Sequence, residues 1–246
     1  MYTQPLSNII QKHQFNYHKY VVDTELQKAA PPSDFSQVSK ETTACVADVK
    51  VWMNKDKFKL HDEKAELLVR GDCTRLSLVR KELQTFGSSS VPFQTSAKYS
   101  GVHLDETLSV NEQISSLCGS SNFHLRKIGS IRSYLSDAST AKLVLFLILS
   151  KHDCCNSTLS GIHSFSLNRL QKVQNNAARL VLRKRKSDHV TPHLKQLHWL
   201  PTEACIYYKI ATIAFGHFDN SLAPYLSELL QIINPPELFV LASKNS

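Results

Sequence analysis

The chain has 246 residues, 42% of them apolar and 20% charged, which is typical of a globular protein of one or two domains and excludes a disordered chain. Seven glycines and leucine-rich segments in the second half disfavour a sandwich or barrel and favour helices. The formal net charge is +8. The segment 169–195 holds eight basic residues and one aspartate, a balance of +7, and this concentration predicts a polyanionic partner.

Cysteines and apolar runs bear on the cellular compartment. The 6 cysteines are scattered and no signal peptide precedes them, so we expect reduced thiols and an intracellular protein, in the nucleus or cytoplasm. The longest apolar run, LVLFLIL at 143–149, is far shorter than the roughly 20 residues of a membrane-spanning helix. It predicts a buried helix and no membrane partner.

The first hundred residues mix strand and helix signals. The run FNYHKYVVDTELQ at 15–27 is aromatic and β-branched, as in a half-buried strand, and ends at the lone Asp23. An Asp-Thr pair such as Asp23 and Thr24 commonly ends a strand, because both side chains can accept hydrogen bonds from nearby backbone N–H groups. A catalytic role for Asp23 is the alternative. Farther along we expect a helix at 36–55, a strand ending at Gly71, a polar loop at 85–96 and strand character at 96–105. This half is therefore α+β.

From residue 109 onward almost every segment predicts helix. The expected helices cover about 109–135, 138–151, 165–186, 191–197, 202–217 and 222–232, and prolines separate the later ones. The change near Asp105 is the expected domain boundary, which divides the chain into 1–105 and 106–246.

The helix at 166–186 has the clearest pattern. At 100° per residue, its basic residues form one stripe and its apolar residues another. The stripe indicates either a solvated face whose cations complement the helix dipole or a surface that contacts RNA or DNA. The candidate nucleic-acid-binding residues in and beside the stripe are Arg169, Lys172, Arg179, Arg183, Lys184, Arg185 and Lys186.

Common catalytic motifs do not occur. The chain has no GxGxxG, GxxxxGK[ST], GxSxG or HExxH sequence, so nothing indicates dinucleotide binding, P-loop chemistry or the common hydrolases. Cys154 and Cys155 are adjacent, with His152 and His163 nearby, but adjacent thiols rarely close one zinc tetrahedron. We therefore predict no zinc site there.

Several motifs in order resemble the C-terminal half of reverse transcriptases from non-LTR (LINE-type) retrotransposons of the jockey and chicken-repeat-like clades. The segments that carry the resemblance include CVADVKVWMNKDKFKLHDEKAELL at 45–68, LQKVQNNAARLV at 170–181 and HVTPHLKQLHWLP at 189–201. The match covers nearly residues 2 to 230. It implies a partial palm at 1–105, followed by a helical thumb and C-terminal region at 106–246.

The resemblance also gives Asp23 a meaning. In the family, Tyr-Ala-Asp-Asp sits on a tight palm hairpin, and its carboxylates help to hold two Mg²⁺ ions for nucleotide transfer. Here the four residues 20–23 read YVVD, so that Val22 replaces the first acid and Asp23 aligns with the second. The side chain of valine has no oxygen for a hard cation. The family's fingers and a further acid lie upstream of the matched region, and we expect them to be missing.

One carboxylate cannot neutralise and position two divalent cations, so we expect no productively bound Mg²⁺ and no polymerisation by this chain alone. Lys64 aligns with a lysine that is a candidate proton donor in the family, and a solvated structural lysine is the other interpretation. The segment 96–105 corresponds to the primer grip. Because the thumb holds nucleic acid through backbone contacts, the cationic stripe can persist without the chemistry.

Three functional hypotheses follow, besides the alternative that the reading frame is a decaying transposon copy whose product has no function. The leading one is a truncated, catalytically inactive derivative that retains sequence-independent binding of RNA or DNA. The second is a functional reverse transcriptase fragment completed by another chain. The third is a non-enzymatic helical module that recruits a protein partner.

Overall fold

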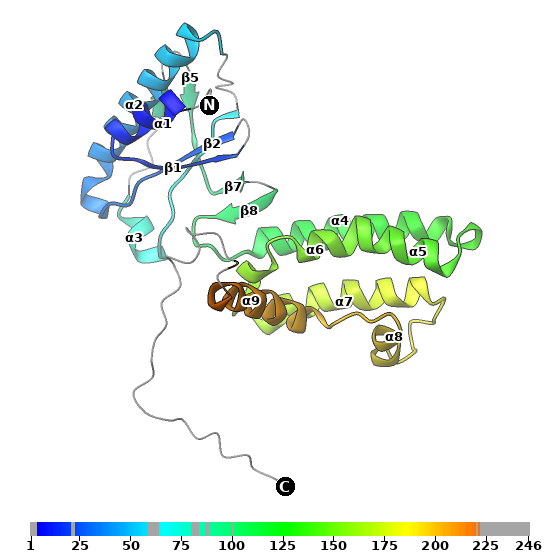
Figure 1. Cartoon of the computed structure of the whole chain (residues 1–246). Helices are drawn as coiled ribbons and strands as arrows, with labels where there is room; N and C mark the ends of the chain where they lie inside the picture. Colours follow the sequence, from blue (N-terminus) through cyan, green and yellow to red (C-terminus); the bar gives the residue numbers. More distant parts are fainter. Residues whose placement is uncertain are drawn as a thin grey trace. The chain divides into compact units, whose positions relative to one another are not determined.

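The structure is a computed structural model and describes residues 4–20, 23–58, 64–79, 84–86, 89–99, 101–219 and 221. The fold is α+β, as predicted, and divides into two compact units, Met1–Gln113 and Ile114–Ser246 (Figure 1). The division lies within helix α4, a few residues beyond Asp105. The expected helix at 222–232 lies outside the described residues.

The first unit begins with two helices and a hairpin that share a core. Helix α1 (Gln4–Lys12) precedes strands β1 (Asn16–Tyr20) and β2 (Asp23–Gln27), and helix α2 (Phe35–Lys55) follows a short 3₁₀ turn, η1 (Pro32–Asp34). The core side chains come from α1, α2 and the residue before β1, and they are Leu6, Ile10, Phe15 and Cys45. The helix predicted at 36–55 is confirmed. The strand predicted to run from Phe15 to Asp23 is β1, and Asp23 does not lead into a loop but begins the antiparallel partner β2, opposite Tyr20.

Short strands fill the rest of this unit. They are β3 (Leu67–Leu68), β4 (Gln84–Phe86), β5 (Ser89–Val91), β6 (Phe93–Gln94), β7 (Ser96–Tyr99) and β8 (Val102–Asp105), with the one-turn helix α3 (Cys73–Ser77) between β3 and β4. The loop prediction for 85–96 was wrong, because β4 and β5 pair with each other and β6 pairs in parallel with β3. Backbone pairing does not require apolar side chains on a strand. Val91, at the end of β5, is buried.

The segment 96–105 has the expected strand character but forms a hairpin. Gly101, with a φ of 87°, lies at its turn, where a side chain would be strained. Asp105 ends β8 and accepts hydrogen bonds from the backbone and side chain of both Thr107 and Ser109. Burial raises the pKa of Asp105, but these hydrogen bonds outweigh it and lower the pKa. The carboxylate thereby fixes the loop that leads into α4.

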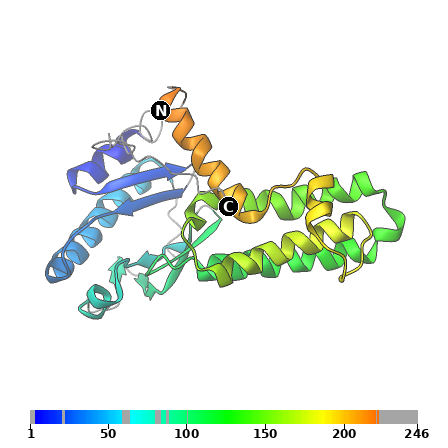
Figure 2. The same ribbon diagram turned by 90° about the horizontal axis from the view of Figure 1, so that it is seen from below.

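The second unit is helical. Its elements are α4 (Asn111–Ser130), the 3₁₀ turn η3 (Arg132–Tyr134), α5 (Asp137–Val144), the π-helical turn η4 (Leu145–Leu149), α6 (Ser150–Asp153), the 3₁₀ turn η5 (Asn156–Leu159), α7 (Ser164–Val181), α8 (Thr191–Gln196) and α9 (Thr202–Phe218). Both views show α4, α5 and α7 running side by side (Figures 1 and 2). The five helical segments expected from 109 to 217 therefore exist. Helices α4, α7 and α8 are shorter than predicted, α9 extends one residue farther, and the segment 138–151 is divided into α5, η4 and α6.

The run at 143–149 is helical but only half buried. Val144 and Ile148 are fully enclosed, whereas Leu145 and Phe146 are exposed, which corrects the prediction of a buried helix. Val144 and Ile148 are four residues apart and therefore lie on one face of the helix, which is the face that packs. None of the helices in the described part of the chain combines the length and the apolar character that crossing a membrane requires.

Candidate nucleic-acid interface

Helix α7 carries the basic stripe and ends earlier than the sequence predicts. Its inward face buries Leu170, Val173, Ala177 and Val181, and the basic stripe lies on other faces. The helix stops at Val181, so the prediction that 165–186 is one helix was wrong at its end. Arg183 adopts a left-handed backbone, with a φ of 54°, and the Lys184 N–H donates to the Arg179 carbonyl at 2.9 Å. This is the geometry of a Schellman ending, in which the chain turns away from the helix axis.

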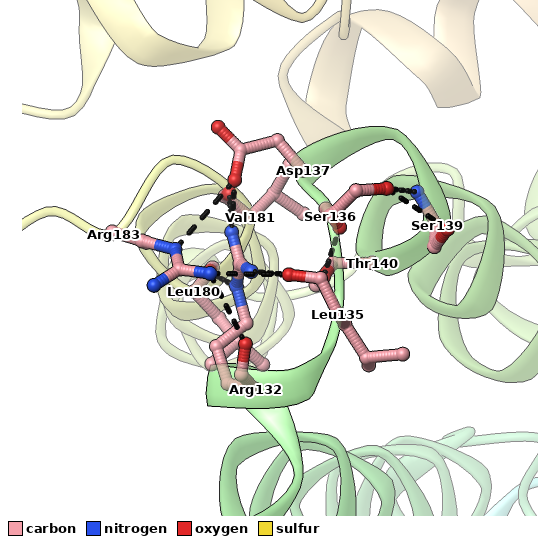
Figure 3. Close-up of polar contacts among 9 residues, drawn as sticks. All are labelled: Arg132, Leu135, Ser136, Asp137, Ser139, Thr140, Leu180, Val181 and Arg183. Carbon is pink, nitrogen blue, oxygen red and sulfur yellow. Dashed lines mark hydrogen bonds and ion pairs between the residues drawn. The ribbon is translucent and has the colours of Figure 1, made fainter.

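A buried arginine from another part of the unit caps this ending (Figure 3). The Arg132 side chain is 9% exposed and donates to the carbonyls of Leu180 at 2.9 Å and Val181 at 2.6 Å. A third hydrogen bond reaches the Leu135 carbonyl, and a fourth reaches the Asp137 carboxylate. The last carbonyls of a helix have no partner within it, and a cation there also complements the helix dipole. Arg132 therefore holds the end of α7 in place.

Arg183 belongs to the same cluster. Its guanidinium donates to the carbonyls of Arg132 and Leu135 at 3.3 and 3.1 Å, and lies 3.7 Å from Asp137. The hydrogen bond from Arg132 holds the pKa of Asp137 below its ordinary value, and the Arg183 charge acts in the same direction. Arg183 is thus committed to the fold, although its side chain is half exposed.

Two other arginines of the stripe also make contacts within the unit. Arg169 donates to the Ser115 hydroxyl at 3.2 Å, and Arg179 donates to the Asp188 carbonyl at 3.1 Å. The Asp188 carboxylate in turn accepts from the backbone N–H of Arg185 at 2.9 Å. Arg179 and Asp188 therefore anchor the segment 183–188 at the end of α7.

The other four predicted binding residues are exposed and make no such contacts with the described part of the chain. Lys172, Lys184, Arg185 and Lys186 are exposed, and within the described residues their charged groups make no hydrogen bond or ion pair. Lys172 lies on α7, and the other three follow its end. Their charges are available to a polyanion because no carboxylate of the described chain neutralises them.

A shallow groove runs beside the stripe and adds a residue that sequence reasoning missed. It has a volume of about 360 Å³ and is lined by Asn122, Leu125 and Arg126 of α4 and by Asn176 and Leu180 of α7. Asn176 is one helical turn from Lys172, so the groove continues the basic surface on to α4. The adjacent basic residues Arg126 and Lys127 were the feature of the sequence that could have indicated this site. Only the packing of α4 beside α7 shows that Arg126 lies next to the stripe. We call Arg126, Lys172, Lys184, Arg185 and Lys186 the exposed basic set.

The predicted catalytic positions lie in the other unit. Asp23 is the first residue of β2, paired with Tyr20 across the hairpin, and its side chain is outside the described part. Val22 also lies outside the described residues. Lys64 is exposed and precedes β3, and no interaction joins it to another described side chain. Among the described residues, no group of three or more His, Cys, Asp or Glu side chains is arranged to hold a metal ion.

Comparisons with protein-family models, with curated proteins and with solved structures found no match to this chain.

Proposed function

We propose that this chain is a sequence-independent RNA- or DNA-binding derivative of a LINE-type reverse transcriptase and that it does not polymerise DNA by itself. The observation that carries the binding proposal is the exposed basic set, five cations on one unit with no acidic partner among the described residues. Phosphates attract such charges without reading a base sequence, so binding is expected to be strong at low salt and to weaken as salt rises.

The motif resemblance supports the relationship to reverse transcriptases. The β1–β2 hairpin has strand residues Tyr20 and Asp23 on either side of its turn, which is the placement that a palm hairpin with a degenerate YxDD motif requires. In this proposal the first unit corresponds to part of the palm, with β7 and β8 in the primer-grip region. The helical unit corresponds to the thumb and C-terminal extension.

The proposed loss of polymerase activity follows from the charge at the hairpin. Two Mg²⁺ ions carry four positive charges, and the family's paired carboxylates are reduced here to Asp23, because Val22 offers no ligand atom. Backbone contacts to template and primer need no such carboxylates. Binding and chemistry can therefore separate.

Fluorescence anisotropy with labelled single-stranded RNA, single-stranded DNA and duplex DNA tests the binding proposal. If the five exposed cations each engage a phosphate, the logarithm of the affinity should fall against that of the salt concentration with a slope of about −3.5 to −4.5. Replacing Lys184, Arg185 and Lys186 by alanine should make the slope shallower by about 2 to 3. No binding at low salt, or a triple variant with an unchanged slope, would overturn the proposal.

Arg169 and Lys172 provide the matched control. Both are basic residues of α7, but Arg169 is bonded to Ser115 and Lys172 has no partner in the described chain. Lys172→Ala should therefore lower the affinity more than Arg169→Ala. Equal losses of affinity in the two variants would show that nucleic acid contacts the whole stripe and not the exposed basic set alone.

Primer extension with Mg²⁺ tests whether this chain polymerises DNA by itself. The second candidate function is a polymerase that another chain completes. The observation in its favour is the retained Asp23 at the hairpin. The proposal predicts no extension by the purified chain. Extension by the purified chain that disappears in Asp23→Ala would overturn the proposal that this chain does not polymerise DNA by itself.

A further inference from the structure

Cys154 and Cys155 lie together on an exposed turn of the helical unit. The turn connects α6 to η5, and both side chains are exposed. Their Sγ atoms are 3.9 Å apart, which is close to van der Waals contact. A disulfide needs an S–S distance of about 2.05 Å, so side-chain rotation within the turn has to bring the two sulfurs together.

The backbone of this turn is unusual for cysteine. Cys154 has φ and ψ of −65° and 118°, and Cys155 has 56° and 25°. These angles are near those of a type II turn, whose second central position is normally glycine because its φ is positive. A side chain there costs about 1 kcal/mol.

Hydrogen bonds hold the turn on both sides. The Cys154 N–H donates to the Ser150 carbonyl at 3.1 Å, and the Cys155 carbonyl accepts from the Thr158 N–H at 3.0 Å. Across the pair, Asn156 Nδ2 donates to the Asp153 carboxylate at 2.9 Å, and Asn156 itself is buried. The two thiols are therefore kept beside each other while remaining open to small reagents.

The other cysteines lack this arrangement. Cys45 and Cys118 are buried, and Cys73 is exposed without a neighbouring cysteine in the sequence. Cys205 is partly buried, and its thiol donates to the Leu200 carbonyl at 3.4 Å. None of these four cysteines has an adjacent cysteine in the sequence, so what sets Cys154 and Cys155 apart is their proximity and exposure.

We propose that Cys154 and Cys155 form a redox-active vicinal dithiol that small-molecule disulfides such as glutathione disulfide oxidise reversibly. One thiolate attacks the small disulfide, forms a mixed disulfide and releases one small thiol. The neighbouring thiolate then attacks the protein sulfur of the mixed disulfide and releases the second small thiol. The protein loses two electrons and two protons, and the small disulfide gains them as two thiols.

The geometry predicts easy reversal. The ring closes through a single peptide bond and across a backbone that is already strained, and strained, exposed disulfides are the readily reduced ones. Burial and the neighbouring Cys154 thiol raise the pKa of Cys155, so that oxidation should become faster as the pH rises above neutral.

Peptide mapping of the full chain tests the proposal. The protein is equilibrated with glutathione disulfide, alkylated and cut with trypsin. Cleavage after Lys151 and Arg169 releases the peptide 152–169, whose only cysteines are Cys154 and Cys155. In the wild type this peptide should lack two hydrogens and resist alkylation until it is reduced. In Cys154→Ser and Cys155→Ser it should instead retain one glutathione, because the resolving thiol is missing.

Cys73→Ser is the control, and it should leave the result for the 152–169 peptide unchanged. Cys155→Gly is a second variant that fits the positive φ, and it should also trap one glutathione on Cys154. The proposal is overturned if the wild-type peptide carries two alkyl groups or two glutathiones under conditions in which the single variants are already glutathionylated.

Discussion

The helical unit uses its basic residues in opposite ways in its interior and on its surface. In the interior, Arg132 is buried and His152 is partly buried, and each is hydrogen-bonded to a neighbouring element: Arg132 to the end of α7 and His152 to Ser121 of α4 at 2.9 Å. On the surface, the exposed basic set makes no such bonds within the described chain. A count of cations in the sequence is therefore not a count of cations available to a ligand.

This contrast separates two kinds of effect. Changes in the interior should lower the free energy of unfolding, because they leave buried polar groups without partners. Changes to the exposed basic set should lower the affinity for nucleic acid and leave unfolding almost unaltered. Variants of both kinds test whether the interior basic residues act on stability and the surface ones on binding.

The largest expected effect is that of Arg132→Met. Methionine keeps much of the packing of the side-chain stem but removes the guanidinium from the carbonyls of Leu135, Leu180 and Val181. We expect the free energy of unfolding in urea to fall by about 3 to 4 kcal/mol. Arg126→Met, on the exposed side of α4, should change it by less than about 0.5 kcal/mol. Equal losses in the two variants would remove the distinction between interior and surface.

The next largest effect is the dependence of the free energy of unfolding on pH, which we attribute to His152. Burial lowers its pKa from 6.5 to about 4, so the folded protein keeps a neutral imidazole where the unfolded chain binds a proton. Stability should therefore be complete above about pH 6.5 and decrease as the pH falls toward about 4, by roughly 2 to 3 kcal/mol. Urea unfolding across this range should show the decrease in the wild type and a smaller one in His152→Gln. Parallel curves for both proteins would exclude His152 as the cause.

The smallest effect concerns Arg183, which lies on the border between the two regions. Its hydrogen bonds to Arg132 and Leu135 are made from a half-exposed side chain. Arg183→Gln should cost about 0.5 to 1 kcal/mol in urea unfolding, and its effect on the salt slope should be smaller than that of Lys184→Gln. If Arg183→Gln changes the salt slope as much as Lys184→Gln does, Arg183 belongs to the binding surface.

Local patterns in the sequence predicted several elements well. Helix α2 was predicted within a residue at each end of the structural bounds, and the amphipathic character of α7 was evident from its period. The strands at 84–94 were missed, because a serine-rich segment pairs through its backbone and shows no apolar alternation. The end of α7 was missed because its cap comes from Arg132, 48 residues from Leu180.

By itself, the sequence determined the α+β character of the chain, the amphipathic helices and the cluster of positive charge between residues 169 and 195. These are properties of neighbouring residues and of their helical or strand period. Only the tertiary structure decided which of those charges are committed to the fold and which remain available, and it alone brought Arg126 beside α7. The reason is physical: a guanidinium is neutralised or capped by the groups that folding brings within hydrogen-bond distance, and in this unit those groups come from segments distant in the sequence.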